Sequence, residues 1–262
     1  MTNTVVADLK QYFDELVRKH NHPDFIPKDP ISIPHLFTHQ QDIEIMGFWA
    51  ATLAWGQRVT IINKSMELIE LMDGRPHHFI LNHSEEDRIR FAQFKHRTFN
   101  YTDTLYFLDF FQRFYRQHES LEEAFVKNMK PEDENVKDGL IGFHELFFNH
   151  ENAPHRTKKH VSTPVRKSCC KRLNMFLRWM VRQDDCGVDF GIWKRIRPDQ
   201  LLMPLDVHVE RVARRFNLIE RKQNDFRTVE ELTNTLKQFD PNDPVKYDFA
   251  LFSIGVLEKK GA

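Results

Sequence analysis

Residues 42–55 constrain the fold more than any other part of the chain, because their apolar side chains would lie on almost every side of a helix. A helix without a polar face must be surrounded by other elements, so we predict that this one is buried in a core. Gly56 then permits a sharp turn. A second helix is expected to follow Gln57 as far as Asp73 and Gly74, where glycine supplies the usual stop. The sequence therefore predicts a helical hairpin with a polar corner.

Composition and periodicity extend this prediction to an all-α fold. The chain has 23 Phe and 8 Met but only 9 Gly in 262 residues, which suits packed helices better than a turn-rich sheet protein. We find no internal repeat and no convincing strand. Apolar spacing predicts further helices at 5–19, 86–95, 102–117, 140–148, 171–181, 207–216, 228–239 and 247–257, and one that starts at the capping box 120–123.

The length is sufficient for one large domain or two small ones that share a core. We expect two helical lobes flanking a cleft. The first is a bundle over 41–150, and the second combines 1–40 with 151–262. Four prolines between residues 20 and 40 predict an extended strap, and the basic, proline-broken loop 152–166 is the expected boundary.

Charge is balanced overall but unevenly distributed. The formal net charge is zero, which argues against a protein that coats nucleic acid by bulk electrostatics. Residues 152–183, however, contain many Lys and Arg and neither Asp nor Glu. This stretch either holds a phosphate backbone or forms an ordinary solvated loop and helix face.

Cysteine content and hydropathy bear on the cellular compartment. Three cysteines, two of them adjacent at Cys169 and Cys170, form neither a disulfide framework nor a four-thiolate cluster. The N-terminal segment is amphipathic and charged, and no run approaches the roughly 20 apolar residues of a membrane span. We therefore expect a reduced, soluble, cytoplasmic protein without membrane association.

Lys171 and Asp206 are the candidate catalytic residues. Lys171 falls in the first turn of the predicted helix 171–181, where the positive end of the helix disfavours an ammonium ion and favours a nucleophilic amine. The alternative is a solvated lysine in a basic patch. Asp206 precedes the helix 207–216 and is a natural N-cap, a role that would explain it without catalysis. Together, such a lysine and aspartate are the groups needed to release a base from DNA through an imine.

Other polar and aromatic residues give weaker signals. Gln57 at the polar corner either bonds base edges or satisfies the loop backbone. Trp55 and Trp179 are candidates for stacking on an extruded base, although core packing is the favoured interpretation of both. The histidine pairs lack carboxylate or thiol companions at ligand spacing, and no Gly-rich phosphate loop or nucleophile elbow occurs. We expect no metal and no cofactor.

Three separated pieces of the chain resemble one superfamily. Residues 204–218, Pro-Leu-Asp-Val-His-Val-Glu-Arg-Val-Ala-Arg-Arg-Phe-Asn-Leu, are similar to the Val-Asp-Thr-His-Val signature of helix-hairpin-helix DNA glycosylases such as endonuclease III. Residues 51–57, Ala-Thr-Leu-Ala-Trp-Gly-Gln, resemble their Leu-Leu-Ser-x-Gln helix corner, and 248–255 resemble their final helix. The spacing from Lys171 to Asp206 is nearest the archaeal 8-oxoguanine glycosylase branch. The whole chain also resembles an uncharacterised bacterial family, domain of unknown function 2400.

The glycosylase resemblance implies a bifunctional DNA glycosylase and abasic-site lyase that acts on an oxidised, flipped-out base, with 8-oxoguanine as the candidate. It places Asp206 on the invariant aspartate and Lys171 on the lysine of the lyase members. An alignment through Arg166-Lys167-Ser168 makes Lys167 the alternative nucleophile. The expected DNA contacts are Gln57, Arg166, Lys167, Arg172 and His208. No Gly-x-Gly hairpin precedes Lys171, and three cysteines are too few for an iron–sulfur cluster.

Two other functions fit the same sequence. One is a non-catalytic adaptor on this fold that grips bent or damaged DNA, or structured RNA. The other is a helical scaffold for a protein partner, which would lack salt-dependent affinity for nucleic acid. The partner that the first hypothesis expects is damaged double-stranded DNA. The sequence leaves open the lesion, the opposite base and the oligomeric state, although a monomer is favoured.

Overall fold

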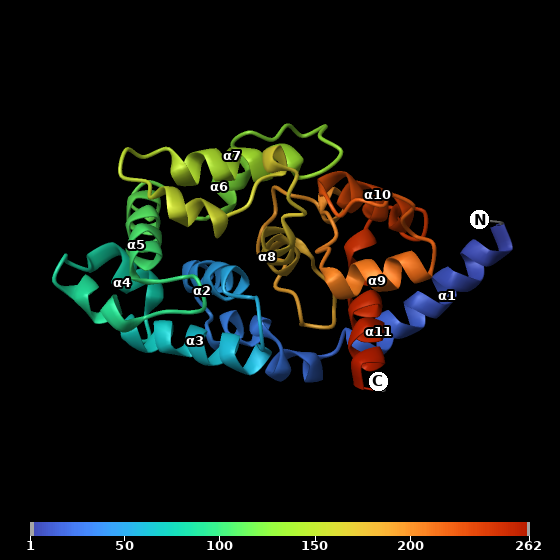
Figure 1. The fold of residues 1–262 in the computed structure, drawn as a ribbon, viewed down its shortest axis with the longest axis horizontal. Helices are drawn as coiled ribbons and strands as arrows, with labels where there is room; N and C mark the ends of the chain where they lie inside the picture. Colours follow the sequence, from blue (N-terminus) through green and yellow to red (C-terminus); the bar gives the residue numbers. More distant parts are fainter. Residues whose placement is uncertain (1–2, 261–262) are drawn as a thin grey trace. The chain divides into compact units, whose positions relative to one another are not determined.

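The structure is a computed structural model that describes residues 3–260, and it consists of α-helices and short 3₁₀-helices joined by loops (Figure 1). Within that range no strand occurs, and the β-type pairing there is one isolated bridge between His96 and Phe99. The all-α prediction is confirmed. None of the helices in the described range is long and apolar enough to cross a membrane.

The described residues divide into two compact units. Unit 1 comprises 3–25, 130–138 and 163–260, and unit 2 comprises 26–129 and 139–162. The expected lobes grouped some of these segments differently. Residues 130–138 belong to unit 1 because Val136 N donates to Gln200 O (3.0 Å) and Gln200 Nε2 donates to Asp133 O (2.9 Å).

Unit 2 is built around α2 (Gln40–Thr52), the predicted buried helix. Phe48 and Trp49 of α2 are fully buried and pack against Phe107 and Phe111 of α5 (Tyr101–Tyr115), so these aromatic rings form the core of unit 2. The aromatic rings lie 4.9–5.9 Å apart, as edge-to-face and tilted pairs do. The other helices are α3 (Arg58–Leu71), α4 (Pro76–Asn82), α5 (Tyr101–Tyr115), α6 (Glu122–Val126) and most of α7 (Lys137–Phe148).

Two local predictions in unit 2 were wrong. The connector before α2 is not an extended strap, because its prolines open short 3₁₀-helices, for which their fixed φ is suitable. Asp29 caps the second of these by accepting from Ile31 N (3.2 Å). The segment predicted as a helix at 86–95 is the 3₁₀-helix η4 (Asp87–Gln93). The 3₁₀-helices of the connector are η1 (Pro23–Lys28), η2 (Pro30–Ser32) and η3 (Pro34–Leu36).

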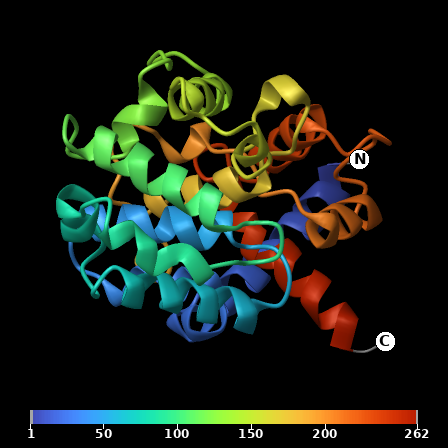
Figure 2. The ribbon, with the colours of Figure 1, turned by 60° about the vertical axis from the view of Figure 1, so that its left-hand side comes forward.

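Unit 1 holds its helices around α11 (Asp248–Lys260), which packs against α1 (Asn3–His20) and α9 (Val207–Arg215). Figures 1 and 2 show the red α11 beside both. The remaining helices are α8 (Lys171–Val181) and α10 (Phe226–Lys237). The prediction of helices at 171–181, 207–216 and 228–239 was therefore correct to within two residues at each end.

A glycine sets the approach of α9 to α11. A Cβ on Gly255 of α11 would lie 3.1 Å from the Cβ of His208 in α9, tighter than side chains usually pack. Arg211 Nη2 donates to Gly255 O (3.1 Å) and closes the same crossing. Because His208 lies in the first turn of α9, this crossing also fixes the place of Asp206.

Candidate active site

Lys171 and Asp206 come together in unit 1. Lys171 is the first residue of α8, Asp206 directly precedes α9, and the lysine Nζ lies 3.9 Å from the Oδ2 of Asp206. Their side chains are 25% and 24% exposed, so the pair can be reached from solvent. The amine also contacts the sulfur of Met175 at 3.3 Å. A primary amine and a carboxylate 35 residues apart in the sequence thus form one accessible ion pair.

Asp206 caps α9 and faces the amine at the same time. Its backbone is extended, and its Oδ1 accepts from the amides of His208 (2.9 Å) and Val209 (3.0 Å). The other oxygen, Oδ2, faces Lys171. Capping therefore fixes the carboxylate in place and does not exclude a second role for it.

A tight hairpin positions Lys171 at the start of α8. The short helix η6 (Pro164–Arg166) is followed by two left-handed residues, Lys167 (φ 59°) and Cys170 (φ 48°). These are conformations in which glycine is usual, and they cost other residues about 1–2 kcal/mol each. Phe226 N donates to Lys167 O (3.2 Å) and ties this hairpin to α10. The sequence lacks the glycine pattern, but the backbone still turns sharply twice before the lysine.

The hairpin also separates the two candidate nucleophiles. Lys167 is exposed, and within the described residues its side chain pairs with no carboxylate. Lys171 is the lysine that the structure brings to Asp206.

Arg178 and Asp248 lie beneath this pair, and sequence reasoning did not single them out. Both side chains are buried, and the guanidinium of Arg178 bridges Asp248 of α11 and Asp189, whose Oδ1 it meets at 3.2 Å. One signal was present in the sequence: Arg178 lies seven residues after Lys171, which is the same face of α8 two turns on.

Asp248 is electrostatically linked to the candidate pair. Burial raises the pKa of its carboxyl to about 6. The negative charge of Asp206 also raises this pKa, whereas the positive charges of Arg178 and Lys171 lower it. Its ordinary value is 3.8. A buried carboxyl group with this pKa can change protonation between mildly acidic and neutral pH.

The raised pKa of Asp248 predicts how stability depends on pH. Because the folded pKa exceeds the unfolded one, the group stabilises the fold fully below pH 3.8, and this contribution is lost as pH rises through about 6. Asparagine resembles the protonated form of the carboxyl and does not titrate. When the pH is raised from 4 to 7, the free energy of unfolding of Asp248→Asn should therefore fall by about 2 kcal/mol less than that of the wild type. Urea unfolding at both pH values measures this difference. Parallel curves for the two proteins would contradict it.

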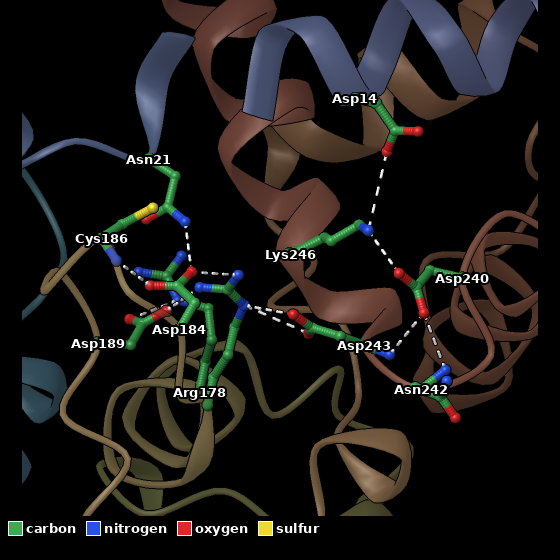
Figure 3. A network of polar contacts seen from close by, with 11 residues as sticks. Asp14, Asn21, Arg178, Asp184, Cys186, Asp189, Asp240, Asn242, Asp243 and Lys246 are labelled. Atoms are coloured by element: carbon green, nitrogen blue, oxygen red, sulfur yellow. Dashed lines mark hydrogen bonds and ion pairs between the residues drawn. The ribbon is translucent and has the colours of Figure 1, made fainter. Parts of the chain in front are cut away.

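A wider ionic network extends from Arg178 through unit 1 (Figure 3). The neighbouring Arg182 is 2% exposed and meets Asp184 (2.6 Å), Asp189 (3.1 Å) and Asp243 (2.9 Å). Burial alone would lower the pKa of Arg182, but these carboxylates raise it above its usual value. Asn21 donates to Asp184 at 2.5 Å, so the end of α1 is joined to the network. The network therefore holds α8, α11 and the residue that follows α1 together.

The remaining candidate residues occupy different environments. Arg166 is exposed in the hairpin, and His208 is half-buried against α11. Arg172 is half-buried, and burial lowers the pKa of its guanidinium to about 10. Trp179 is fully buried, so its indole is part of the core, as the favoured interpretation of the sequence had it.

Gln57 and Trp55 belong to unit 2. Gln57 is exposed at the N-cap of α3. Trp55 is half-buried, with its indole against the rings of His96 (4.8 Å) and His160 (5.8 Å). In the described range, no group of three or more His, Cys, Asp or Glu could hold a metal ion.

The fold and site define an all-α protein with a lysine and an aspartate paired where two helices begin. Residues 29–257 match the model of a family described as "Protein of unknown function (DUF2400)". The chain belongs to this family, and the resemblance to it is confirmed. No curated protein and no solved structure matches the chain.

Proposed function

We propose that the protein is a bifunctional DNA glycosylase and abasic-site lyase that removes an oxidised, flipped-out base. The observation that carries the proposal is the 3.9 Å separation of Lys171 Nζ from Asp206 Oδ2, with both side chains partly exposed. The resemblance of residues 204–218 to the helix-hairpin-helix DNA glycosylases supplies the reaction class, and 8-oxoguanine is the candidate lesion.

In this reaction Asp206 would take a proton from the Lys171 ammonium, and the resulting amine attacks C1′ of the flipped nucleotide. The bond from C1′ to the base breaks, and the base leaves with the bonding electron pair and takes up a proton. The nitrogen then passes a proton to O4′ as the C1′–O4′ bond opens, which leaves a hydroxyl at O4′ and a Schiff base at C1′. Removal of a C2′ proton expels the 3′ phosphate and nicks the strand. Asp206 would stabilise the positive charge that develops on the sugar.

Groups outside the pair would hold the DNA. Arg166 and Lys167 are exposed in the hairpin before α8, where they would meet phosphates, with Arg172 behind them. Gln57 of unit 2 would probe the duplex next to the vacated base. The proposal requires that the two units border a common cleft, which stays a prediction, as does the cytoplasmic location.

Reductive trapping tests this proposal. Wild-type protein is incubated with duplexes that contain 8-oxoguanine, an abasic site or no lesion, and sodium borohydride is added to reduce any imine. The proposal predicts a covalent protein–DNA complex with the two damaged duplexes and none with the undamaged one. An absence of complex with the abasic duplex, where no base has to be removed first, would exclude the lyase.

Asp206→Asn separates catalysis from binding. Asparagine also serves as an N-cap, so α9 and the affinity for DNA should be retained. Loss of the negative charge should slow release of 8-oxoguanine about a hundredfold. Single-turnover cleavage assays and binding titrations on the same duplex measure the two effects. Release at the wild-type rate would remove Asp206 from the mechanism.

The adaptor hypothesis predicts a different pattern. Lys171 and Asp206 lie within ion-pair distance, so their contact is also consistent with an ion pair that only stabilises the N-terminus of α9. In that case wild type and Asp206→Asn bind the damaged duplex equally, and neither cleaves it.

A further inference from the structure

Three segments that are distant in the sequence meet at one corner of unit 2. The first is the α2–α3 corner, residues 55–58; the second is the turn 95–98; the third is η5 (His155–Lys159) with His160. The His96 ring donates to the carbonyl of Trp55 (3.2 Å), and the Trp55 indole lies against the His160 ring. Arg156 Nη2 donates to Thr98 O (3.0 Å) and joins the third segment to the second. We call these residues the corner surface.

The segments that form the corner surface share an unusual composition. Residues 45–66, 88–102 and 152–162 contain no Asp or Glu, although 38 of the 262 residues are acidic. The Lys and Arg residues of the corner surface are Arg58, Lys95, Arg97, Arg156, Lys158 and Lys159. A chain with zero net charge thus collects positive charge at one place in unit 2.

The acidic residue that binds Arg156 of the corner surface is itself buried. Asp103 is fully buried and accepts from Arg156 and from Thr157 Oγ1 (2.8 Å), with His160 Nε2 at 3.4 Å. Burial opposes ionisation, but bonds from His160, the Asn100 amide and Thr157 keep the pKa of Asp103 below its ordinary value. Asp103 therefore compensates Arg156 within the protein interior.

A rigid turn presents two of these cations to solvent. His96 and Phe99 exchange two backbone hydrogen bonds of 2.9 Å, which places Arg97 and Thr98 at the tip of a two-residue turn. Arg97 is left-handed (φ 55°), and its guanidinium would lie 3.5 Å from a Cβ on Gly56. Lys95 and Arg97 are exposed, and neither pairs with a carboxylate anywhere in residues 3–260. Two unneutralised cations next to the exposed Gln57 are suited to phosphate oxygens.

We propose that the corner surface binds the phosphate backbone of duplex DNA, independently of the Lys171 site in unit 1. The surface offers cations, the Gln57 amide and the Thr98 hydroxyl, and Val59, which follows it in α3, is an exposed apolar side chain at its edge. A protein partner would instead require an apolar, aromatic centre. The choice of DNA as the partner rests on the proposed function.

Charge reversal at the turn tests this inference. The full-length double variant Lys95→Glu/Arg97→Glu is compared with Arg75→Glu/Arg116→Glu, which reverses two charges at exposed positions of unit 2. Arg75 follows the end of α3, whose other end begins at Arg58 in the corner surface. Arg116 follows the last residue of α5, about 22 Å along the helix from its start near the turn. Binding of a fluorescent, undamaged 20-base-pair duplex is titrated at several salt concentrations; the probe length is about two helical turns.

At roughly 0.1 M salt the turn variant should bind DNA about tenfold more weakly. The slope of its affinity against salt concentration should fall by the equivalent of about two phosphate contacts. The control should bind like the wild type. Arg97→Asn removes one charge and tolerates the left-handed backbone, so it should give a smaller loss with an unchanged melting temperature. Equal affinities for the turn and control variants would overturn the inference, as would tighter binding of an RNA duplex of the same sequence.

The result also separates this inference from the proposed function. If the turn variant loses affinity for DNA but the wild type gives no borohydride-trapped complex, the corner surface stands and the lyase is excluded. If trapping occurs and is as efficient in the turn variant at limiting DNA as in the wild type, the corner surface is excluded and the lyase stands.

Discussion

Replacing Lys171 by glutamine should reduce the yield of borohydride-trapped complex about a thousandfold or more, because an amide cannot form an imine with the sugar. Lys171 is partly exposed at the start of α8, so the change should leave the fold intact. Its Nζ is the amine that lies next to Asp206, which pairs with no other lysine or arginine in residues 3–260. Trapping on an abasic duplex, quantified by gel shift after denaturation, measures the effect.

Lys167→Gln is the matched control for this prediction. Lys167 lies four residues earlier in the same basic hairpin and has the same side chain, but it is exposed and forms no ion pair with Asp206. We expect this variant to bind DNA somewhat more weakly and to be trapped with normal efficiency once bound. The opposite pattern, loss of trapping in Lys167→Gln alone, would reassign the nucleophile.

Replacing Arg178 by methionine should lower the free energy of unfolding by about 3–5 kcal/mol, because it leaves buried carboxylates without their counter-charge. Asp248 would lose the guanidinium that neutralises it, and Asp189 would retain only Arg182. The cation above the ring of Phe249, 4.6 Å from the centroid, would also be lost. Urea unfolding at pH 8, followed by circular dichroism, measures the change.

An exposed arginine supplies the control for Arg178. The side chain of Arg197 is 49% exposed and pairs with Asp199 at 3.0 Å, so Arg197→Met should change stability by less than about 0.5 kcal/mol. The Arg178→Met/Asp248→Asn variant should recover part of the loss, since it removes the uncompensated charge as well. Equal stability of Arg178→Met and Arg197→Met would show that the buried carboxylates do not depend on the charge of Arg178.

Most helices could be predicted because their apolar spacing is a local property of the sequence. The helices that were not predicted depend on contacts between residues far apart in the sequence, which the apolar spacing does not reveal. Helix α4 has only seven residues, and its N-terminus is capped by Asp42, whose Oδ1 accepts from His77 N at 2.7 Å. Thirty-five residues separate these partners, so the capping signal is absent from the local sequence.

The Lys171–Asp206 contact was anticipated by family resemblance, whereas the residues beneath it were missed. Charged residues are usually at the surface, so Arg178 and Arg182 were interpreted as part of a basic stretch. Their carboxylate partners lie up to 70 residues away and become visible only when α8 packs on α11. Trp179 could be assigned more readily, because core packing is the usual place of an indole on the apolar face of a helix.

The most direct test of the account is the identity of the modified residue in the trapped complex. Wild-type protein is reduced onto an abasic duplex with borohydride, the DNA is digested, and tandem mass spectrometry locates the residual sugar on a peptide. The account predicts a single adduct on Lys171. An adduct on Lys167 or on any other amine, or no adduct at all, would contradict it.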